Sequence, residues 1–198
     1  VSHYFRQNFS QVTNPPIDSL RENKVMSLKT RFGNLGNILD FDNLTEENIY
    51  VLDSPILTNS QFRKFKKFFS KKTKVIDCSF DISLSLKDRI EEIREEAETS
   101  VREGSTCLIL SDKNINTQRA SIPSILTVGA VHSHLVKHGL RGYCSLNVEC
   151  SDALDTHSFA VLIGVGATTV NPYLAIDSIY QRFEKKLFGK SEFEGCVT

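Results

Sequence analysis

The feature that most constrains the fold is a strand-and-helix unit that recurs four times after residue 74. In each copy a short apolar run is followed by polar residues and then by a helical pattern. The four runs cover residues 75–78, 106–110, 143–148 and 167–170. Successive units of this kind lie parallel in one sheet through right-handed crossovers. The sequence therefore predicts an α/β fold with a mostly parallel sheet, or a partial (β/α) barrel, since four units cannot close an eight-stranded barrel.

The helical part of the first unit has the clearest periodicity. Apolar residues recur there at three- and four-residue spacing, which places them on one face of a helix, and Gly104 stands where a C′ glycine would end it; they are Leu86, Ile90, Ile93, Ala97 and Val101. Further helices are expected from about Ile122 to Gly139, through Phe159 to Gly164, and from Tyr173 into 184–187.

Residues 1–60 follow a different, irregular pattern. They combine helical stretches at 4–12 and from about Asp18, a turn at 13–16, a Gly/Asn-rich loop at 33–37 and an apolar run at 49–52. Such a segment tends to wrap a domain. We expect all 198 residues to form one domain, with 1–60 as the wrapping segment and 75–187 as the βα repeats.

Composition excludes several partners and suggests a compartment. The 24 basic and 24 acidic residues cancel, so no overall field attracts nucleic acid or an anionic membrane. The five cysteines are odd in number and widely spaced, which favours free thiols in a reducing cytoplasm. No apolar run reaches 18 residues, and the N-terminus has neither an initiator Met nor a signal-peptide pattern. We expect a cytoplasmic piece of a longer chain.

The segment 62–74 is the most basic, with seven basic residues and four phenylalanines. Interleaved aromatic and basic side chains suit RNA or a membrane surface. Phe62, Phe65 and Phe69, however, recur at helical spacing. An amphipathic helix with buried phenylalanines and solvated lysines is the favoured interpretation.

Polar residues at the ends of the expected strands are the main candidates for a site. Asp112, Lys113, Glu149 and Asn171 stand where α/β folds place their chemistry. A nucleophile is weakly suggested by Ser111 beside Asp112 and Lys113, or by Cys150 with His157. Neither pattern matches a nucleophile elbow.

Metal and phosphate sites are not expected. The histidines His132, His134, His138 and His157, taken with Cys150, lack the spacing of a metal motif, and His132 and His134 point to different faces of a helix. Gly164-Val165-Gly166 lacks the third glycine of a phosphate loop. We predict no catalytic, cofactor-binding or metal-binding residue in this chain.

Several motifs in order resemble the central domain of the glutamate synthase large chain. They include Gln11-Val12-Thr13-Asn14-Pro15-Pro16-Ile17-Asp18, Val25-Met26-Ser27-Leu28, Leu108-Ile109-Leu110-Ser111-Asp112 and Asn171-Pro172-Tyr173-Leu174-Ala175. The resemblance runs from residue 4 to about 177. The chain departs from the family at His132-Ser133-His134 and at Glu149-Cys150-Ser151-Asp152, where the family usually has three histidines and Glu-Thr-Gly-Glu.

The resemblance implies a role between two catalytic domains of one parent chain. That enzyme, an oxidoreductase, makes two glutamates from glutamine and 2-oxoglutarate. It uses an amidotransferase domain and a domain that binds FMN and a [3Fe-4S] cluster. The central domain would join them and help to enclose an ammonia tunnel, without a cofactor or activity of its own. The electron donor, ferredoxin or a nicotinamide, stays open.

By the same resemblance, the segment nearest the tunnel or an interface comprises Thr13, Asn14, Pro15, Pro16, Arg21, Met26 and Ser27. Prolines stiffen a turn, and Met offers an adaptable apolar wall. A turn that only packs against a neighbouring domain is an equal alternative. For the whole chain, the alternatives are a stand-alone βα-type enzyme using Asp112, Lys113 and Glu149, or an interaction module.

Overall fold

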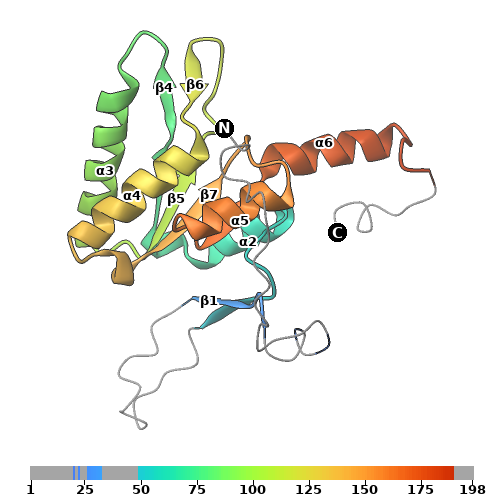
Figure 1. The fold of residues 1–198 in the computed structure, drawn as a ribbon, viewed down its shortest axis with the longest axis horizontal. Coiled ribbons are helices and arrows are strands. Elements are labelled where there is room, and N and C mark those ends of the chain that lie inside the picture. Colours follow the sequence, from blue (N-terminus) through green and yellow to red (C-terminus); the bar gives the residue numbers. More distant parts are fainter. Residues whose placement is uncertain (1–19, 21, 23–25, 33–48, 190–198) are drawn as a thin grey trace, which may run out of the picture.

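The structure is a computed structural model that describes residues 20, 22, 26–32 and 49–189 (Figure 1). Its centre is a sheet of four parallel strands in the order β3-β5-β7-β8. The strands are β3 (Thr73–Asp77), β5 (Cys107–Ser111), β7 (Ser145–Glu149) and β8 (Thr169–Asn171). Each unit thus adds its strand beside the previous one. The predicted α/β fold with a parallel sheet is confirmed.

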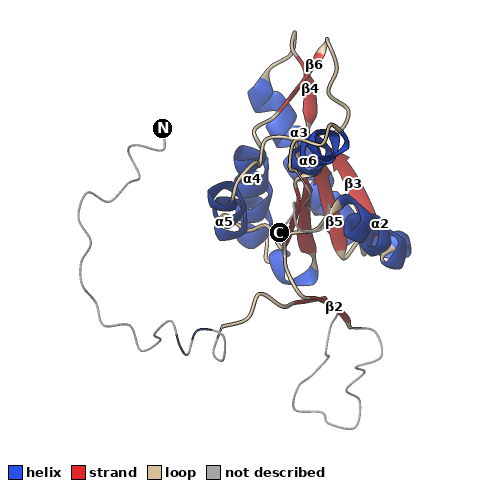
Figure 2. Cartoon of the chain, turned by 90° about the vertical axis from the view of Figure 1, so that its right-hand side faces the viewer, coloured by secondary structure: helices blue, strands red, loops and turns tan. Residues whose placement is uncertain are grey.

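The three crossover helices all cover the same face of this sheet (Figure 2). They are α3 (Leu86–Arg102), α4 (Ser124–Lys137) and α5 (Thr156–Gly164). We call this the apolar face. It buries Leu108, Leu110 and their strand neighbours against the helices in one continuous hydrophobic core. Sequential strands with all crossovers on one side are the arrangement found in part of a (β/α) barrel.

A second layer covers the opposite face. It consists of α2 (Asn59–Phe68) and an antiparallel ribbon of β1 (Thr30–Phe32) and β2 (Tyr50–Leu52). Their side chains form a separate aromatic cluster over Cys107 and Ile109 of β5. Segment 55–57 lies along β8, where the Leu57 amide donates to the Val170 carbonyl at 2.8 Å.

Local signals set the helix boundaries. Thr58 and Gln61 form a capping box at the start of α2, and Ser85 caps α3. Helix α3 ends at Arg102, and Gly104 follows its C-cap with a φ of 96°, a conformation that favours glycine, as its position predicts. The last helix, α6 (Tyr173–Glu184), follows β8 as expected.

Two features differ from the sequence expectations. A short antiparallel ribbon, β4 (Ser79–Asp81) with β6 (Arg119–Ser121), extends beyond the sheet. Tyr143 lies in a 3₁₀ turn (Arg141–Tyr143) rather than in the third strand, which runs to Glu149. The expected elements at 4–12, 13–16 and 33–37 lie outside the described residues, as does most of the helix expected from Asp18.

Within the described ranges, no helix is long and apolar enough to cross a membrane. Cys78, Cys107, Cys144 and Cys150 are free and buried.

Candidate functional site

The strand register aligns four polar residues in one row at the carboxyl end of the sheet. Asp77 pairs with Ser111, Ser111 with Glu149, and Glu149 with Asn171. Residues one position away along each strand point to the apolar face, so this row lies on the side covered by α2. We call this side the polar face. The predicted gathering of Glu149 and Asn171 at the strand ends is therefore observed.

Glu149 is the centre of the row and is 3% exposed. Its carboxylate accepts a hydrogen bond from Ser111 Oγ at 2.8 Å and contacts Lys113 Nζ at 2.8 Å. Lys66 Nζ, from α2, lies 3.3 Å from both carboxylate oxygens. Burial alone would raise the pKa of Glu149, but the hydrogen bonds from Lys113 and Ser111 and the two lysine charges hold it below its usual value. Glu149 is thus an ionised, fully paired carboxylate and a poor general base.

Asp112 lies one residue beyond the row and is also buried. Its Oδ2 accepts hydrogen bonds from Ser121 Oγ at 3.0 Å and from Ser151 Oγ at 2.6 Å, and from the Ser151 amide at 3.0 Å. Among the residues that the structure describes, its Oδ1 has no hydrogen-bond partner. Asp112 Oδ2 therefore ties the ends of β5, β6 and β7 together.

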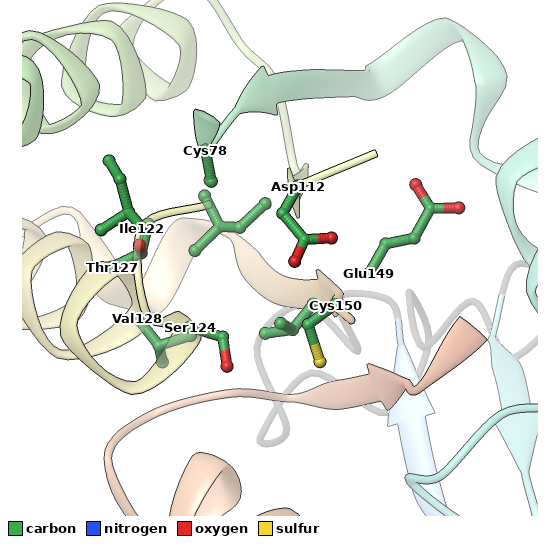
Figure 3. Close-up of a pocket in the computed structure, with 10 residues that line it drawn as sticks. Cys78, Asp112, Ile122, Ser124, Thr127, Val128, Glu149 and Cys150 are labelled. Atoms are coloured by element: carbon green, nitrogen blue, oxygen red, sulfur yellow. The ribbon is translucent and has the colours of Figure 1, made fainter. Parts of the chain in front are cut away.

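A small cavity beside Asp112 lies over the ends of β5 and β7 (Figure 3). Cys78, Ile122, Thr127 and Cys150 contribute to its wall. The centre of a water molecule can occupy about 10 Å³ of this cavity. The cavity therefore has room for one water and not for an organic substrate. A water there would satisfy the open oxygen of Asp112.

Lys113 and Tyr173 cover the row from the solvent side. Lys113 Nζ lies 4.9 Å from the centroid of the Tyr173 ring, a cation–π contact. The pKa of the Tyr173 hydroxyl rises to about 12, because of burial and then the negative charge of Asp112. The hydroxyl therefore stays protonated at neutral pH.

Asn171 and Asp77 close the two ends of the row. Asn171 Nδ2 donates to the Leu57 carbonyl and to Asn59 Oδ1, both at 2.9 Å, and so fixes the start of α2. The Asp77 carboxylate accepts from Ser79 Oγ at 2.7 Å and from Arg119 at 3.1 Å. Every member of the row thus has its partners inside the domain.

The suggested nucleophiles do not gain support from this geometry. Cys150 is 1% exposed, and burial raises its pKa to about 12, so a thiolate does not form at neutral pH. Its suggested base, His157, is exposed at the start of α5. Ser111 donates to Glu149, whose lowered pKa makes it a weak acceptor of the serine proton.

The basic segment at 62–74 forms the predicted amphipathic helix. Phe62 and Phe65 are 1% and 0% exposed, and Phe65 packs edge-to-face against Phe32 of the β1–β2 ribbon. One detail of the prediction is wrong, since Lys66 is not a solvated lysine but the partner of Glu149. Nothing in the local sequence reveals this pairing, because the two residues are 83 positions apart.

Most of the tunnel or interface candidates, namely Thr13, Asn14, Pro15, Pro16 and Arg21, lie outside the described residues. Met26 and Ser27 are described and exposed, with Met26 at 59%. The Ser27 hydroxyl accepts a hydrogen bond from the Lys29 amide at 3.2 Å. Their role stays a prediction.

Comparison with known proteins identifies the family. The family model described as the glutamate synthase central domain matches residues 1–196. The chain is 53% identical, over 98% of its length, to the large chain of an NADPH glutamate synthase from Azospirillum brasilense. It is 40% identical over 90% of its length to the ferredoxin-dependent glutamate synthase of Spinacia oleracea, and 39% identical over 98% to the large chain from Bacillus subtilis. It spans only 13%, 11% and 14% of those three proteins. The chain belongs to the glutamate synthase central domain family.

Proposed function

We propose that this chain is the connecting domain of a glutamate synthase large chain. It links a glutamine amidotransferase domain to a synthase domain that binds FMN and a [3Fe-4S] cluster. The parent enzyme converts glutamine and 2-oxoglutarate to two glutamates, and this domain helps to enclose the route of ammonia between the two sites. The observation that carries the proposal is the family match over residues 1–196.

The closed polar row supports a connecting role rather than a catalytic one. A catalytic carboxylate or lysine needs a path to substrate and an unfilled position beside it. Glu149 has three partners within the domain, and the adjacent cavity admits one water. The alternative of a stand-alone enzyme based on Asp112, Lys113 and Glu149 has no specific observation in its favour.

Exposed apolar residues on the carboxyl edge of the sheet supply a surface for neighbouring domains. The loops after the strands and the first turns of the helices meet at this edge (Figure 1). They expose large apolar side chains, with Leu84 at 67% and Leu154 at 68%. Others on the same edge are Ile82, Ile115, Ile125, Leu126 and Leu174. A domain taken from a larger protein is expected to expose such a surface.

The first turns of α3 continue this surface. They form a shallow, open depression lined by Ser85, Leu86, Lys87, Ile90 and Glu91. Leu84, directly before it, is exposed. We propose that the carboxyl edge, with the first turns of α3, packs against another domain of the parent chain.

The seven candidate residues at 13–27 complete the proposal. In the assembled enzyme they line the ammonia route or the interface beside it. Since Met26 and Ser27 are exposed in this chain, a neighbouring domain can reach them.

The test uses the complete parent chain encoded by the gene that contains this sequence. The double variant Leu84→Asp with Leu154→Asp places charges in the proposed interface. We expect glutamine-dependent glutamate synthesis to fall by at least about tenfold, because a buried unpaired charge costs more than the 1.4 kcal/mol that a factor of ten represents. Glutamine hydrolysis alone and synthesis from added ammonium should be largely retained.

The matched control is Val136→Asp. Val136 is an exposed apolar residue at the C-terminal end of α4, away from the carboxyl edge of the sheet. It should leave glutamine-dependent synthesis within about twofold of the wild type, since exposed substitutions are usually mild. Equal losses in the control and the double variant would refute the interface. A parent gene without amidotransferase and FMN-binding domains would refute the connecting role.

A further inference from the structure

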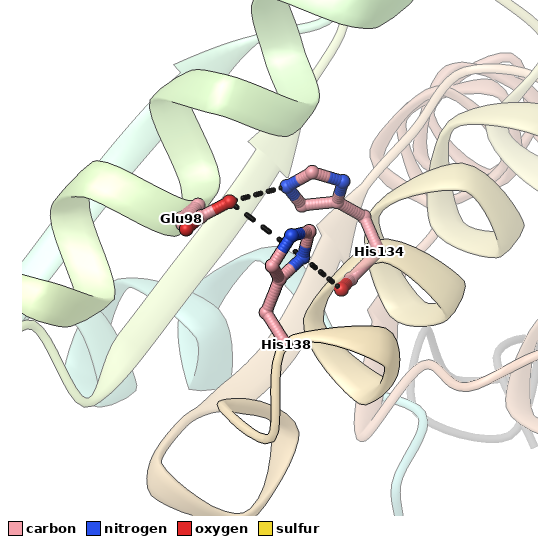
Figure 4. A group of neighbouring side chains, drawn as sticks. All are labelled: Glu98, His134 and His138. Atoms are coloured by element: carbon pink, nitrogen blue, oxygen red, sulfur yellow. Dashed lines mark hydrogen bonds and ion pairs between the residues drawn. The ribbon is translucent and has the colours of Figure 1, made fainter.

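Helices α3 and α4 bring together three side chains with metal-binding atoms (Figure 4). His134 Nε2 lies 2.6 Å from Glu98 Oε2, and His138 Nδ1 lies 3.7 Å from the same oxygen. The three ligand atoms all lie within 4.8 Å of one another. The cluster is separate from the polar row, because it lies in the helix layer that covers the apolar face of the sheet.

The two histidines have the spacing of a chelating pair. Residues four apart on a helix face the same side, and two imidazoles at this spacing with a carboxylate are a zinc-binding set. Sequence spacing alone left His134 and His138 without a third ligand, because Glu98 is 36 residues away on α3. The packing of α3 on α4 supplies it.

The ligand atoms lie near one another but are not at the spacing of an occupied site. With metal–ligand bonds of about 2.1 Å, ligand atoms around a tetrahedral ion lie about 3.4 Å apart. The two separations at Glu98, 2.6 Å and 3.7 Å, fall on either side of this value. A shift of about 1 Å in the side chains would admit the ion, since such a change needs only rotamer adjustment.

We propose that Glu98, His134 and His138 bind one divalent transition metal ion, with Zn²⁺ as the best match, and leave a fourth position to water. Imidazole and carboxylate ligands suit Zn²⁺, whereas Mg²⁺ and Ca²⁺ prefer oxygen alone. The proposed site differs from the prediction, made from the sequence, that the chain has no metal-binding residue. It is independent of the connecting role proposed above.

In the metal-free chain, protons occupy the ligand nitrogens. His134 Nε2–H donates to Glu98, and His138 Nδ1–H donates to the His134 carbonyl at 2.9 Å. On binding, the ion replaces these two N–H hydrogen bonds, and each neutral imidazole keeps its proton on the other ring nitrogen. Arg102 donates to the other Glu98 oxygen at 2.9 Å and orients the carboxylate without blocking Oε2.

One feature limits the affinity. His134 Nδ1 is buried and has no hydrogen-bond partner in the described part of the chain, whereas a metal-bound histidine usually donates from its second nitrogen. We expect one Zn²⁺ per chain with a dissociation constant on the order of 10 µM, weaker than a structural zinc site. Bound metal crosslinks α3 to α4 and should raise the melting temperature.

The experiment titrates the 198-residue chain with Zn²⁺ by calorimetry, and with Co²⁺ by absorption, at a pH of about 7.5. His138→Gln should weaken binding by at least about tenfold, the loss typical even of outer-shell partners. Glu98→Gln should do the same. His157→Gln, an exposed histidine outside the cluster, should bind as the wild type does.

The Co²⁺ spectrum distinguishes this site from the cysteines. Nitrogen and oxygen ligation gives weak visible bands without the intense thiolate-to-cobalt charge-transfer band. If Glu98→Gln fails to fold, His138→Gln alone decides, because it leaves the Glu98–His134 bond in place. Absence of Zn²⁺ binding by the wild type, equal binding by His138→Gln, or a thiolate band would each overturn the proposal.

Discussion

The face of the sheet under α3, α4 and α5 is sealed by apolar side chains, whereas the face under α2 carries buried polar ones. Leu108, Leu146 and Val148 on the first face are at most 1% exposed. Asn147, Glu149 and Thr169 on the second face are equally buried, at 0% to 3%. The same strands supply both sets, because alternate residues point to opposite faces.

The difference shows two ways of burying the faces of one sheet. Apolar packing is non-directional, so it stabilises in proportion to the area removed from water. The polar face is stable only if each buried group has its partner. Thr169 Oγ1 donates to Asn147 Oδ1 at 2.8 Å, while Asn147 Nδ2 donates to the Leu108 carbonyl at 3.1 Å. A buried polar cluster at the strand ends can therefore be structural, although its position resembles that of an active site.

The largest effect is expected on the apolar face. Leu108→Ala removes a fully buried side chain and should lower the free energy of unfolding by about 2–5 kcal/mol. The loss should be the same at pH 5 and pH 8, because no charge is involved. Denaturant unfolding at both pH values measures it. A clear pH dependence would mean that the two faces are not separate.

In the helix layer over the apolar face, Gly166 packs directly against the His132 ring. An added Cβ at Gly166, with φ of 123°, would lie 2.4 Å from the His132 ring. Arg141 holds that ring by donating to Nδ1 at 3.2 Å. Gly166→Ala should cost about 3 kcal/mol, from a strained backbone and overpacking.

Gly139→Ala is the control for Gly166→Ala. Its φ is also positive, at 69°, but apart from its chain neighbours no atom of the described residues lies within 4 Å of the added Cβ. It should cost only about 1 kcal/mol, the backbone part of the penalty. The two losses of unfolding free energy are compared by thermal unfolding. Equal losses for both variants would show that a clash with the His132 ring does not contribute to the cost of Gly166→Ala.

On the polar face, Thr169→Val tests the need for complete pairing. Valine has nearly the shape of threonine but cannot donate to Asn147 Oδ1, which then stays buried without this partner. We expect a loss of about 1–3 kcal/mol in unfolding free energy. Thr156→Val, at an exposed helix position, is the matched control and should be nearly neutral. A neutral Thr169→Val would show that the polar face tolerates open hydrogen bonds.

Glu149→Gln gives a smaller loss that depends on pH. The pKa of Glu149 in the folded state is below its usual value of 4.5. Its ionised form therefore contributes stability that is present above about pH 4.5 and is lost as the pH falls through the folded-state pKa. The variant should lose about 1–2 kcal/mol near neutral pH, because Lys66 and Lys113 can still reach water.

Unfolding curves of Glu149→Gln and the wild type should converge on acidification. Glu95→Gln, an exposed glutamate on α3, should follow the wild-type curve throughout. A constant offset for Glu149→Gln, like that expected for Leu108→Ala, would contradict the ionised state assigned to Glu149.

The sequence predicts the apolar face better than the polar one. The stripe from Leu86 to Val101 and the continuous apolar run of β5 have periods that reveal a helix and a buried strand. The three-residue strands β1, β4 and β6 are too short to show a period. The partners of Glu149 come from α2 and from the loop after β5, so only the folded chain brings them together.

The central claim is that the polar row is structural and that the chain is a connector without a ligand site of its own. The direct test is the melting temperature of the chain with and without ligands. The 198-residue chain is heated with saturating glutamine, 2-oxoglutarate or FMN, since a ligand that binds only the folded state must raise the melting temperature. We predict no shift with any of the three. A saturable shift with one of them, abolished by Glu149→Gln, would show that the row is a binding site and would contradict the account.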